Sequence, residues 1–557
     1  MSKRIVSMVA LVLILALAVS LSGCGSKGEN TPKEGTASPK AGETTKPAGE
    51  KPADVPDKYD PPIEMSTVTF NYSYPKFDKG DDINNNPWSR YMLETYGIKV
   101  NTLWDTSTDY DQKVNLMIAS GNIPDFFAVS PTQFKQLYDA GLIEDLTDSY
   151  NQYASEGIKS IMKDAGAEVM ESATLNGKLM AIPWTGEAQV GVPVLWIRQD
   201  WFDALKLSAP KSMNDVLEIA KAFTTQDPDG NKKDDTFGLA MDKDFNLMTG
   251  FLNGYHAYKD IWVEDGAGGL AFSGLQPEMK EALAILQDMF KNKQIDPEFG
   301  VKDTTKVNES IGSNKLGMIF GNIELANTMQ KITPNTSWLP FPVPSIDAEP
   351  ALMQHPLNVY GLYWVVKKGT KNPEAIYKML QAWVDLYYDN TSEEIYAKYN
   401  AIQGTGYWMN APIKIYKTFS DVEVYRQIKP LLESKDRENA DLSKLTPAAR
   451  SAYKQILEYE KGNMEFRGRN GKTGLNGSAS VIDSYVANNQ YKPEAFTTLP
   501  TPAMLLKTPN LLKMQYQMIS KIILGAPLDE FDKFVEQYKK LGGDEITAEV
   551  NEWYKNK

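Results

Sequence analysis

From residue 67 onward, hydrophobic and polar residues are spaced in ways that predict alternating strands and helices. The stretch 67–72 alternates apolar and polar side chains, as expected of a strand with one buried face. Asn86-Pro87 supplies an N-cap and a first helical residue, and Gly97 supplies a stop, so we expect a helix between them. The elements expected next are a strand over 98–103, a helix over 110–120, a strand over 125–129 and a helix from Pro131 to about Gly141. This β-α-β-α-β order with short connections predicts an α/β fold with a mostly parallel sheet.

The alternation continues through the middle of the chain, and the last part is predicted to be mainly helical. The elements expected are strands over 192–198, 315–320 and 360–366, and helices over 212–224, 278–291, 373–386, 448–459, 511–523, 528–540 and 546–554. The folded part exceeds the length at which a single hydrophobic core usually stops growing, which predicts two lobes rather than one.

The N-terminal segment 1–23 has the pattern of a lipoprotein signal peptide. A short basic stretch precedes an almost wholly apolar run over 5–19, which is short for a membrane span and typical of a secretory signal. The segment ends in Leu21-Ser22-Gly23 before Cys24, a sequence similar to the bacterial lipobox, in which the cysteine becomes the first mature residue and carries lipid. Cys24 is the single cysteine of the chain, which suits a role that needs no partner thiol.

Residues 24–62 are rich in proline, glycine, lysine and glutamate, and Tyr59 is their one aromatic residue. Such a composition cannot bury a core and predicts a disordered, solvated tether. A tether between a lipid and a folded body places that body on the extracellular face of the cell membrane.

Composition and charge exclude several functional classes. The formal net charge of −13 argues against a nucleic-acid partner, which would require a basic face. One cysteine and two histidines leave no disulfide framework and little room for a histidine-built metal centre or a serine triad. Gly471-Lys472-Thr473 resembles the end of a P-loop, but Phe466 stands where that motif needs glycine, so we expect an ordinary loop.

Eight stretches carry a resemblance to a known family: NPWSRYMLETYGIKV (86–100), QKVNLMIASGNIPDFFAV (112–129), AGLIEDLTDSY (140–150), NGKLMAIPW (176–184), LWIRQDWFDALKL (195–207), DPDGNKKDDTFGLA (227–240), GSNKLGMIFGN (312–322) and GAPLDEFDKFVEQYKKLGGDEITAEVNEWY (525–554). In this order, after a lipobox and a polar tether, they resemble the large extracellular solute-binding proteins of family 1. These are lipid-anchored sugar receptors of ABC importers in Gram-positive bacteria.

The resemblance implies a periplasmic-binding-protein-like fold of type II, with two α/β lobes, a hinge that the chain crosses more than once, and a ligand in the interlobe cleft. The first lobe would comprise 63–187 and 345–403, and the second 188–344 and 404–557. The lobes would close on an oligosaccharide, and the closed form would be recognised by the permease subunits of an ABC transporter. The protein is expected to act as a monomer.

A sugar offers apolar ring faces and a rim of hydroxyls, so its site needs aromatic rings and polar side chains. The aromatic candidates lie where predicted strands end or loops face the expected cleft, and they are Trp184, Tyr255, Trp262, Tyr407 and Trp408. The polar candidates are Glu187, Gln189 and Asn322. Trp184 is the first choice for stacking, although core packing is the alternative for each aromatic residue. Trp196, Trp201, Trp364 and Trp383 lie within apolar periodic patterns and are assigned to the core.

An acidic stretch resembles a calcium-binding loop. Asp227, Asp229, Asn231 and Asp235 stand at positions 1, 3, 5 and 9 of an EF-hand-like rhythm, and Lys233 at position 7 could offer its backbone carbonyl. The turn glycine stands at position 4 instead of 6, and position 12 lacks the usual glutamate. A structural Ca²⁺ is therefore expected, with a plain surface turn as the alternative.

The leading hypothesis is a receptor that captures an oligosaccharide and performs no chemistry. The alternatives are a secreted glycosidase that uses two carboxylates, or a receptor in the same fold for another solute such as a peptide.

Overall fold

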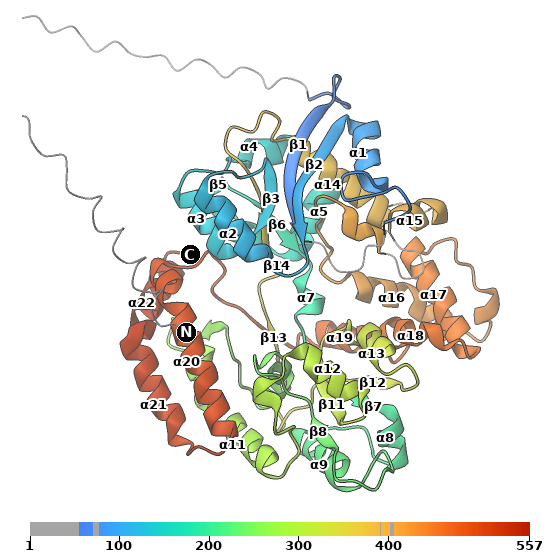
Figure 1. Cartoon of the computed structure of the whole chain (residues 1–557), viewed down its shortest axis with the longest axis vertical. Coiled ribbons are helices and arrows are strands. Elements are labelled where there is room, and N and C mark those ends of the chain that lie inside the picture. The colour runs from blue at the N-terminus through green and yellow to red at the C-terminus, as the bar shows by residue number, and fades with distance from the viewer. Residues whose placement is uncertain (1–54, 71–76, 390–391, 401–405) are drawn as a thin grey trace, which may run out of the picture. The chain divides into compact units, whose positions relative to one another are not determined.

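The structure, a computed structural model, describes residues 55–70, 77–389, 392–400 and 406–557, so the signal segment, Cys24 and most of the predicted tether lie outside it. Two hydrophobic cores organise the described residues. The first core draws mainly on residues 59–184 and 359–415, and the second mainly on residues 192–353 and 422–550. Figure 1 shows the elements of the first core in its upper half and most of those of the second in its lower half, with α7 (Glu187–Val190) between them.

The first core is built from short strands covered by helices. Its N-terminal elements are β1 (Ile63–Phe70), α1 (Pro87–Tyr96), β2 (Ile98–Thr106), α2 (Tyr110–Ser120), β3 (Phe126–Val129), α3 (Pro131–Asp139), α4 (Thr147–Tyr153), α5 (Glu156–Ala165), α6 (Ala167–Ser172), β4 (Thr174–Leu175), β5 (Lys178–Leu179) and β6 (Ile182–Thr185). Its later elements are β14 (Val359–Val366), α14 (Ala375–Val384) and α15 (Glu393–Tyr399).

Helix boundaries in this region follow the capping residues read from the sequence. The Asn86 side chain accepts hydrogen bonds from the backbone N–H groups of Trp88 and Ser89, and Gly97 ends α1 in the left-handed conformation at φ 67°. Helix α2 spans 110–120 and also ends on a left-handed glycine, Gly121. These two predicted helices are confirmed.

The sheets are mixed, so the predicted mostly parallel sheet is wrong. Strands β1 and β2 are parallel, with Ile63 opposite Ile98. The other sheet of the first core has the order β3-β14-β6, and β14 runs antiparallel to both neighbours, with Trp364 opposite Ala128 and Ile182. The β-α-β-α-β reading considered only neighbours in sequence, whereas β14 returns from the second core and inserts between two much earlier strands.

The second core contains a four-stranded sheet and most of the helices of the C-terminal half. Its elements before residue 356 are β7 (Val194–Arg198), α8 (Gln199–Ala204), α9 (Met213–Thr225), β8 (Phe237–Leu239), α10 (Thr249–Gly254), β9 (Trp262–Glu264), β10 (Leu270–Phe272), α11 (Pro277–Lys291), α12 (Thr304–Gly312), β11 (Leu316–Gly321), α13 (Leu325–Ile332), β12 (Trp338–Phe341) and β13 (Met353–His355). The later elements are α16 (Ser420–Leu432), α17 (Pro447–Glu460), α18 (Arg467–Thr473), α19 (Ser478–Ala487), β15 (Tyr491–Pro493), α20 (Pro502–Ile523), α21 (Asp529–Tyr538) and α22 (Asp544–Lys555).

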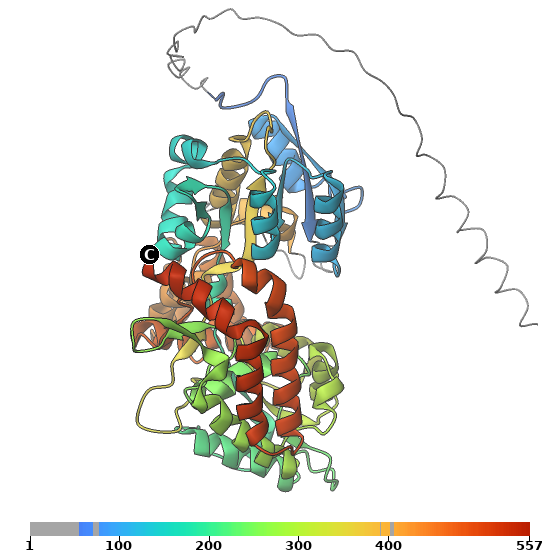
Figure 2. The ribbon, with the colours of Figure 1, turned by 90° about the vertical axis from the view of Figure 1, so that its left-hand side faces the viewer.

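The sheet of the second core has the order β12-β7-β11-β8, with β7 antiparallel to β12 and β11, and β11 parallel to β8. The C-terminal helices, red in Figure 2, lie against the green elements of this core, and α20 packs on α11. Helices α16 and α17 share a small core of their own around Ile428, Tyr453 and Ile456.

The packing differs in two places from the boundaries predicted from the sequence. Residues 55–62, assigned to the tether, are described by the structure, and Tyr59 is buried with its hydroxyl donating to Glu374 at 2.7 Å. Ala411, Ile413 and Ile415, assigned to the second lobe, pack in the first core. In both cases the side chains find partners that are distant in sequence. Within the described residues, no helix is both long and apolar enough to cross a membrane.

Candidate binding site

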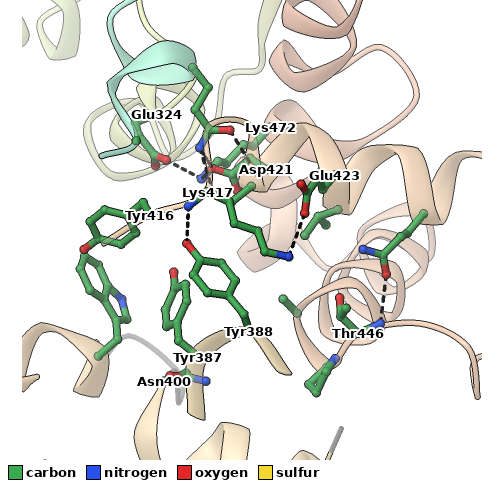
Figure 3. A pocket seen from close by; sticks show the side chains of 18 of the residues that line it. Glu324, Tyr387, Tyr388, Asn400, Tyr416, Lys417, Asp421, Glu423, Thr446 and Lys472 are labelled. Atoms are coloured by element: carbon green, nitrogen blue, oxygen red, sulfur yellow. Dashed lines mark hydrogen bonds and ion pairs between the residues drawn. The ribbon is translucent and has the colours of Figure 1, made fainter. Parts of the chain in front are cut away.

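A cavity of about 440 Å³ lies where elements of the first core meet α13, α16, α17 and α18. Its residues come from segments that are far apart in the sequence, and Figure 3 shows them converging. The lining residues are Gly186, Gln189, Val190, Glu324, Asn327, Tyr387, Tyr388, Tyr396, Asn400, Trp408, Tyr416, Lys417, Ser420, Asp421, Glu423, Val424, Gln427, Thr446, Pro447, Ala448, Arg469 and Lys472.

Aromatic rings form one wall of the cavity. The ring centroids of Tyr387 and Tyr388 lie 4.8 Å apart, and that of Trp408 lies 6.4 Å from Tyr387 and 6.2 Å from Tyr416. Trp383 stacks on Tyr387 at 4.2 Å, which fixes the orientation of this tyrosine. Burial raises the pKa of both Tyr387 and Tyr388, so these phenols stay neutral. Such a wall offers flat apolar faces with polar tips, which suits a ligand that has both kinds of surface.

A π-helical turn brings two successive tyrosines to this wall. The chain leaves α14 through the π-turn Asp385–Asp389, and both Tyr387 and Tyr388 line the cavity. In a regular α-helix, side chains of adjacent residues point about 100° apart, and only one of them would face a given surface. Single π-turns of this kind occur frequently at functional sites.

Paired charges form the opposite side of the cavity. Lys472 Nζ lies 2.8 Å from Asp421 Oδ2 and also contacts the carboxylate of Glu324. The Gln189 amide donates to Asp421 Oδ2 at 3.0 Å, while its carbonyl oxygen accepts from the Asp421 backbone N–H. Burial opposes the charge on Lys472, but the carboxylates of Asp421 and Glu324 outweigh it and raise the lysine pKa. The lysine is therefore a cation that holds two carboxylates in place.

A second ion pair lies beside the tyrosine wall. Lys417 Nζ lies 3.5 Å from Glu423 Oε2 and 5.1 Å from the ring centroid of Tyr388. The backbone N–H of Lys417 donates to the Tyr388 hydroxyl at 3.0 Å, so the same residue orients the phenol and covers its ring.

Asn400 lines the cavity and is largely buried. Its side chain is buried and donates through Nδ2 to the carbonyl of Leu386 at 2.7 Å. Its Oδ1 is buried and has no hydrogen-bond partner among the residues that the structure describes. A buried acceptor without a donor is costly.

The structure brings two of the residues proposed from the sequence, Gln189 and Trp408, to the cavity. Trp184 does not line this cavity; it is buried and stacks on Trp364 with centroids 4.8 Å apart. Tyr407 is also buried, and its hydroxyl donates to Asp78 at 2.8 Å. Glu187 begins α7, and its side chain lies outside the described part of the chain.

Three further candidates occupy other places in the second core and its surroundings. Tyr255 packs on Phe251, and Trp262 packs on Phe272. Asn322 Oδ1 accepts from the backbone N–H of Glu324 at 3.0 Å, which shapes the turn before α13.

Residues that carry most of the cavity chemistry were not identified from the sequence: Tyr387, Tyr388, Asn400, Asp421 and Lys472. The adjacent tyrosines just beyond a predicted helix were the one local signal, because both cannot face the same core. Lys472 was expected in a loop, and this expectation is wrong. It lies in α18, which packs on α13 and carries the lysine to Glu324.

The acidic loop lies between α9 and β8. The Asn231 side-chain amide donates to Asp229 Oδ2 at 2.8 Å and to Asp235 Oδ1 at 3.2 Å, and the backbone N–H of Lys233 donates to Asn231 Oδ1. Asp227 Oδ1 is buried and has no hydrogen-bond partner within the described residues. Within the same ranges, no three His, Cys, Asp or Glu side chains are grouped as a metal site. The loop therefore contains oxygen atoms of the kind that ligate a cation, and one of them, Asp227 Oδ1, has no hydrogen-bond partner within the described residues.

Two cores with a polar and aromatic cavity where their elements meet define a solute-binding protein of the two-lobed class. Residues 80–394 match the model of the bacterial extracellular solute-binding proteins, and the chain belongs to this family.

Particular relatives are known by name. Lipoprotein LipO of Bacillus subtilis strain 168 is 23% identical over 478 residues, which cover 83% of this chain and 88% of LipO. The polygalacturonan/rhamnogalacturonan-binding protein YtcQ of the same strain is 27% identical over 226 residues, 40% of this chain and 43% of YtcQ.

The fold is similar to that of FusA, an ABC-transporter substrate-binding protein of Streptococcus pneumoniae solved in complex with kestose. The TM-score is 0.58 at 18% identity, and the match covers 89% of this chain and 99% of FusA. A second FusA structure, described as an EF-hand mutant in complex with fructo-nystose, matches equally well.

Proposed function

We propose that this protein captures an oligosaccharide in the cavity between its two cores and delivers it to the permease of an ABC transporter. The observation that carries the proposal is the cavity itself, with aromatic rings on one side and hydrogen-bonding side chains on the other, in a member of a solute-binding family. Aromatic faces match the C–H faces of sugar rings, and the polar groups match hydroxyls. The names of FusA and YtcQ, which bind saccharides, support this ligand class.

The test is a thermal-shift screen of oligosaccharides, followed by calorimetry on those that raise the melting temperature. A ligand that binds the native state raises this temperature, and the stabilisation grows with the logarithm of its concentration over its Kd. Peptides of similar size belong in the same screen, because the alternative receptor would respond to them. If peptides bind and saccharides do not, the proposal fails.

We infer that no bond is broken at the site. The cavity contains the carboxylates Glu324, Asp421 and Glu423, which a glycosidase would also need, but each is engaged by a lysine. A general acid has to hold a proton near neutral pH, whereas burial of Glu324, outweighed by the charge of Lys472, leaves the pKa of this carboxyl lowered. Prolonged incubation with each bound saccharide should leave it intact by chromatography, whereas steady release of shorter products would favour the glycosidase alternative.

We further propose that lipid on Cys24 holds the protein, as a monomer, at the extracellular face of the membrane. The lipobox at 21–24 supports this, as does the lipoprotein name of LipO. Labelling cells with a palmitate analogue should mark the wild-type protein, and Cys24→Ser should abolish the label and release the protein into the medium. A membrane-bound, unlabelled Cys24→Ser protein would contradict the anchor.

We propose a structural Ca²⁺ for the loop Asp227–Asp235. The alternating oxygen ligands and the unsatisfied Asp227 Oδ1 fit a hard cation that takes oxygen ligands, and the EF-hand named for FusA supports it. Asp227, Asp229, Asn231 and Asp235 would hold the ion through side-chain oxygens, and Lys233 through its carbonyl. The ion would supply loop stability rather than chemistry.

A further inference from the structure

The charges around the cavity cancel one another. Its lining contains three cations, Lys417, Arg469 and Lys472, and three carboxylates, Glu324, Asp421 and Glu423. A cavity built to hold an acidic ligand would show an excess of positive charge. This lining has none.

The cations are also engaged where they stand. Lys472 bridges Asp421 and Glu324, and Lys417 pairs with Glu423. Arg469 donates through Nε to Gln455 at 3.0 Å. Burial works against the charge of Glu324, but Lys472, joined by Arg469, lowers the pKa of this carboxyl. The two carboxylates Glu324 and Asp421 and the two cations Lys472 and Arg469 therefore neutralise one another.

An acidic ligand would have to break the ion pairs of this cluster. If a ligand carboxylate recruited Lys472, it would leave Asp421 and Glu324 without their buried partner, and uncompensated buried charge is strongly unfavourable. An uncharged ligand can bind beside the cluster without disturbing it.

The overall charge of the chain also opposes an anionic ligand, independently of these pairs. The chain carries a net charge of −13, so a polyanion is repelled before it reaches the cavity.

We propose, on the basis of the function proposed above, that the ligand is an uncharged oligosaccharide and that the cavity discriminates against saccharides built from uronic acids. The selecting feature is the mutual neutralisation of the Glu324–Lys472–Asp421 cluster together with Arg469, and of the Lys417–Glu423 pair.

The experiment compares saccharides that differ in the carboxylate alone. Oligogalacturonates are measured beside their carboxyl-reduced products, which keep the same linkage and length but carry hydroxymethyl groups. Neutral fructo-, malto-, xylo-, manno- and galacto-oligosaccharides are measured in parallel, by calorimetry on the full-length protein at low and at high salt.

The tightest ligand of the whole set should be uncharged, and its affinity should change less than about threefold with salt, because no net charge is neutralised on binding. If an oligogalacturonate binds at least tenfold more tightly than its reduced product, with affinity that falls as salt rises, the inference is overturned while the proposed function stands. If no saccharide binds, the proposed function itself fails, and the inference with it.

Two variants test the cause. Glu324→Gln and Glu423→Gln each remove one carboxylate and leave the lining with excess positive charge. Each should raise the affinity for an oligogalacturonate, relative to that for its carboxyl-reduced product, by several-fold. The reason is that a ligand carboxylate and an unpaired cation of the lining, within the same cavity, attract one another by more than RT. Glu309→Gln removes an exposed carboxylate of α12 that lies outside the cavity, and should leave the ratio unchanged. Melting temperatures check that each variant is folded, and an unchanged ratio in both cavity variants would overturn charge cancellation as the selecting feature.

Discussion

Trp408 offers the cavity the largest flat surface of its lining residues. Its ring packs edge-on against Tyr387 and Tyr416, so its position is set before any ligand arrives. We expect Trp408→Ala to weaken oligosaccharide binding by about thirtyfold, because truncation of a buried aromatic anchor costs about 2 kcal/mol or more. Calorimetry with the best saccharide from the screen measures this.

The matched control is Trp104→Ala. Trp104 is a half-buried tryptophan of β2 that does not line the cavity, and its ring contacts Lys113. Its replacement removes similar apolar area and should leave the affinity unchanged. Equal losses in both variants would mean that Trp408 acts through general stability and not through contact with the sugar.

Lys414 is a fully buried lysine next to the site. Its Nζ donates to the carbonyls of Met409 and Ala411, at 3.0 and 2.6 Å, in the segment that carries Trp408. Burial lowers its pKa to about 7. Because this value lies below that of an exposed lysine, the unfolded chain binds more protons than the native protein between about pH 7 and pH 10. This group therefore makes stability rise with pH in that window, by at most about 1.4 kcal/mol per pH unit, and contributes no slope below it.

Lys414→Met keeps the side-chain length and removes the titrating group. Urea unfolding at several pH values should show a shallower rise in stability for the variant than for the wild type between pH 7 and pH 10. Identical slopes would mean that the Lys414 ammonium is solvated in the native state.

For single residues, the sequence predicted which amino-acid types line the cavity better than it predicted which members of each type do so. Trp184 and Trp408 carry equal local signals, yet Trp184 lies in β6 and stacks on Trp364 of the neighbouring strand β14, whereas Trp408 is half-buried against the first core and lines the cavity. The difference arises because β14 inserts beside β6, a pairing between segments far apart in the sequence. No spacing within either segment encodes it.

Among the elements, helices with strong caps were predictable and the irregular turns were not. The caps of α1 lie within a few residues of each other, so the sequence contains the whole signal. The π-turn at 385–389 depends on Trp383 stacking behind Tyr387 and on the Tyr388 hydroxyl meeting the backbone of Lys417. These contacts require the folded neighbours, and for this reason the tyrosine wall was missed.

The acidic loop is the element whose prediction is simplest to test. We expect Ca²⁺ to raise the melting temperature and a chelator to reverse the rise, because an ion held only by the native loop stabilises it by about 2.7 kcal/mol at a hundred times its Kd. The double variant Asp229→Asn/Asp235→Asn should lose this response. Asp234→Asn changes the same loop at a position outside the alternating set and should keep it. A wild-type melting temperature indifferent to calcium would favour the plain surface turn.

For the whole molecule, the arrangement of the cavity implies how binding would be transmitted. Gly186, Gln189 and Val190 of the lining belong to the segment that connects the two cores, and the rest comes from elements on either side. A ligand in the cavity would contact elements of both cores at once. It would favour the arrangement of the two cores in which it makes the most contacts. The connecting segments at 186–193, 354–358 and 416–421 would then accommodate the change.

We expect small-angle scattering to show a smaller radius of gyration when the protein is saturated with its oligosaccharide. Interactions made by one ligand with two bodies stabilise a closed arrangement only in the bound state. The Trp408→Ala variant at the same sugar concentration is the control, since its cavity should stay largely empty and its radius unchanged. If calorimetry shows saturation of the wild type while its scattering curve stays the same, the ligand is held without closure, and a permease would have to recognise the complex by the sugar or by local changes at the cavity.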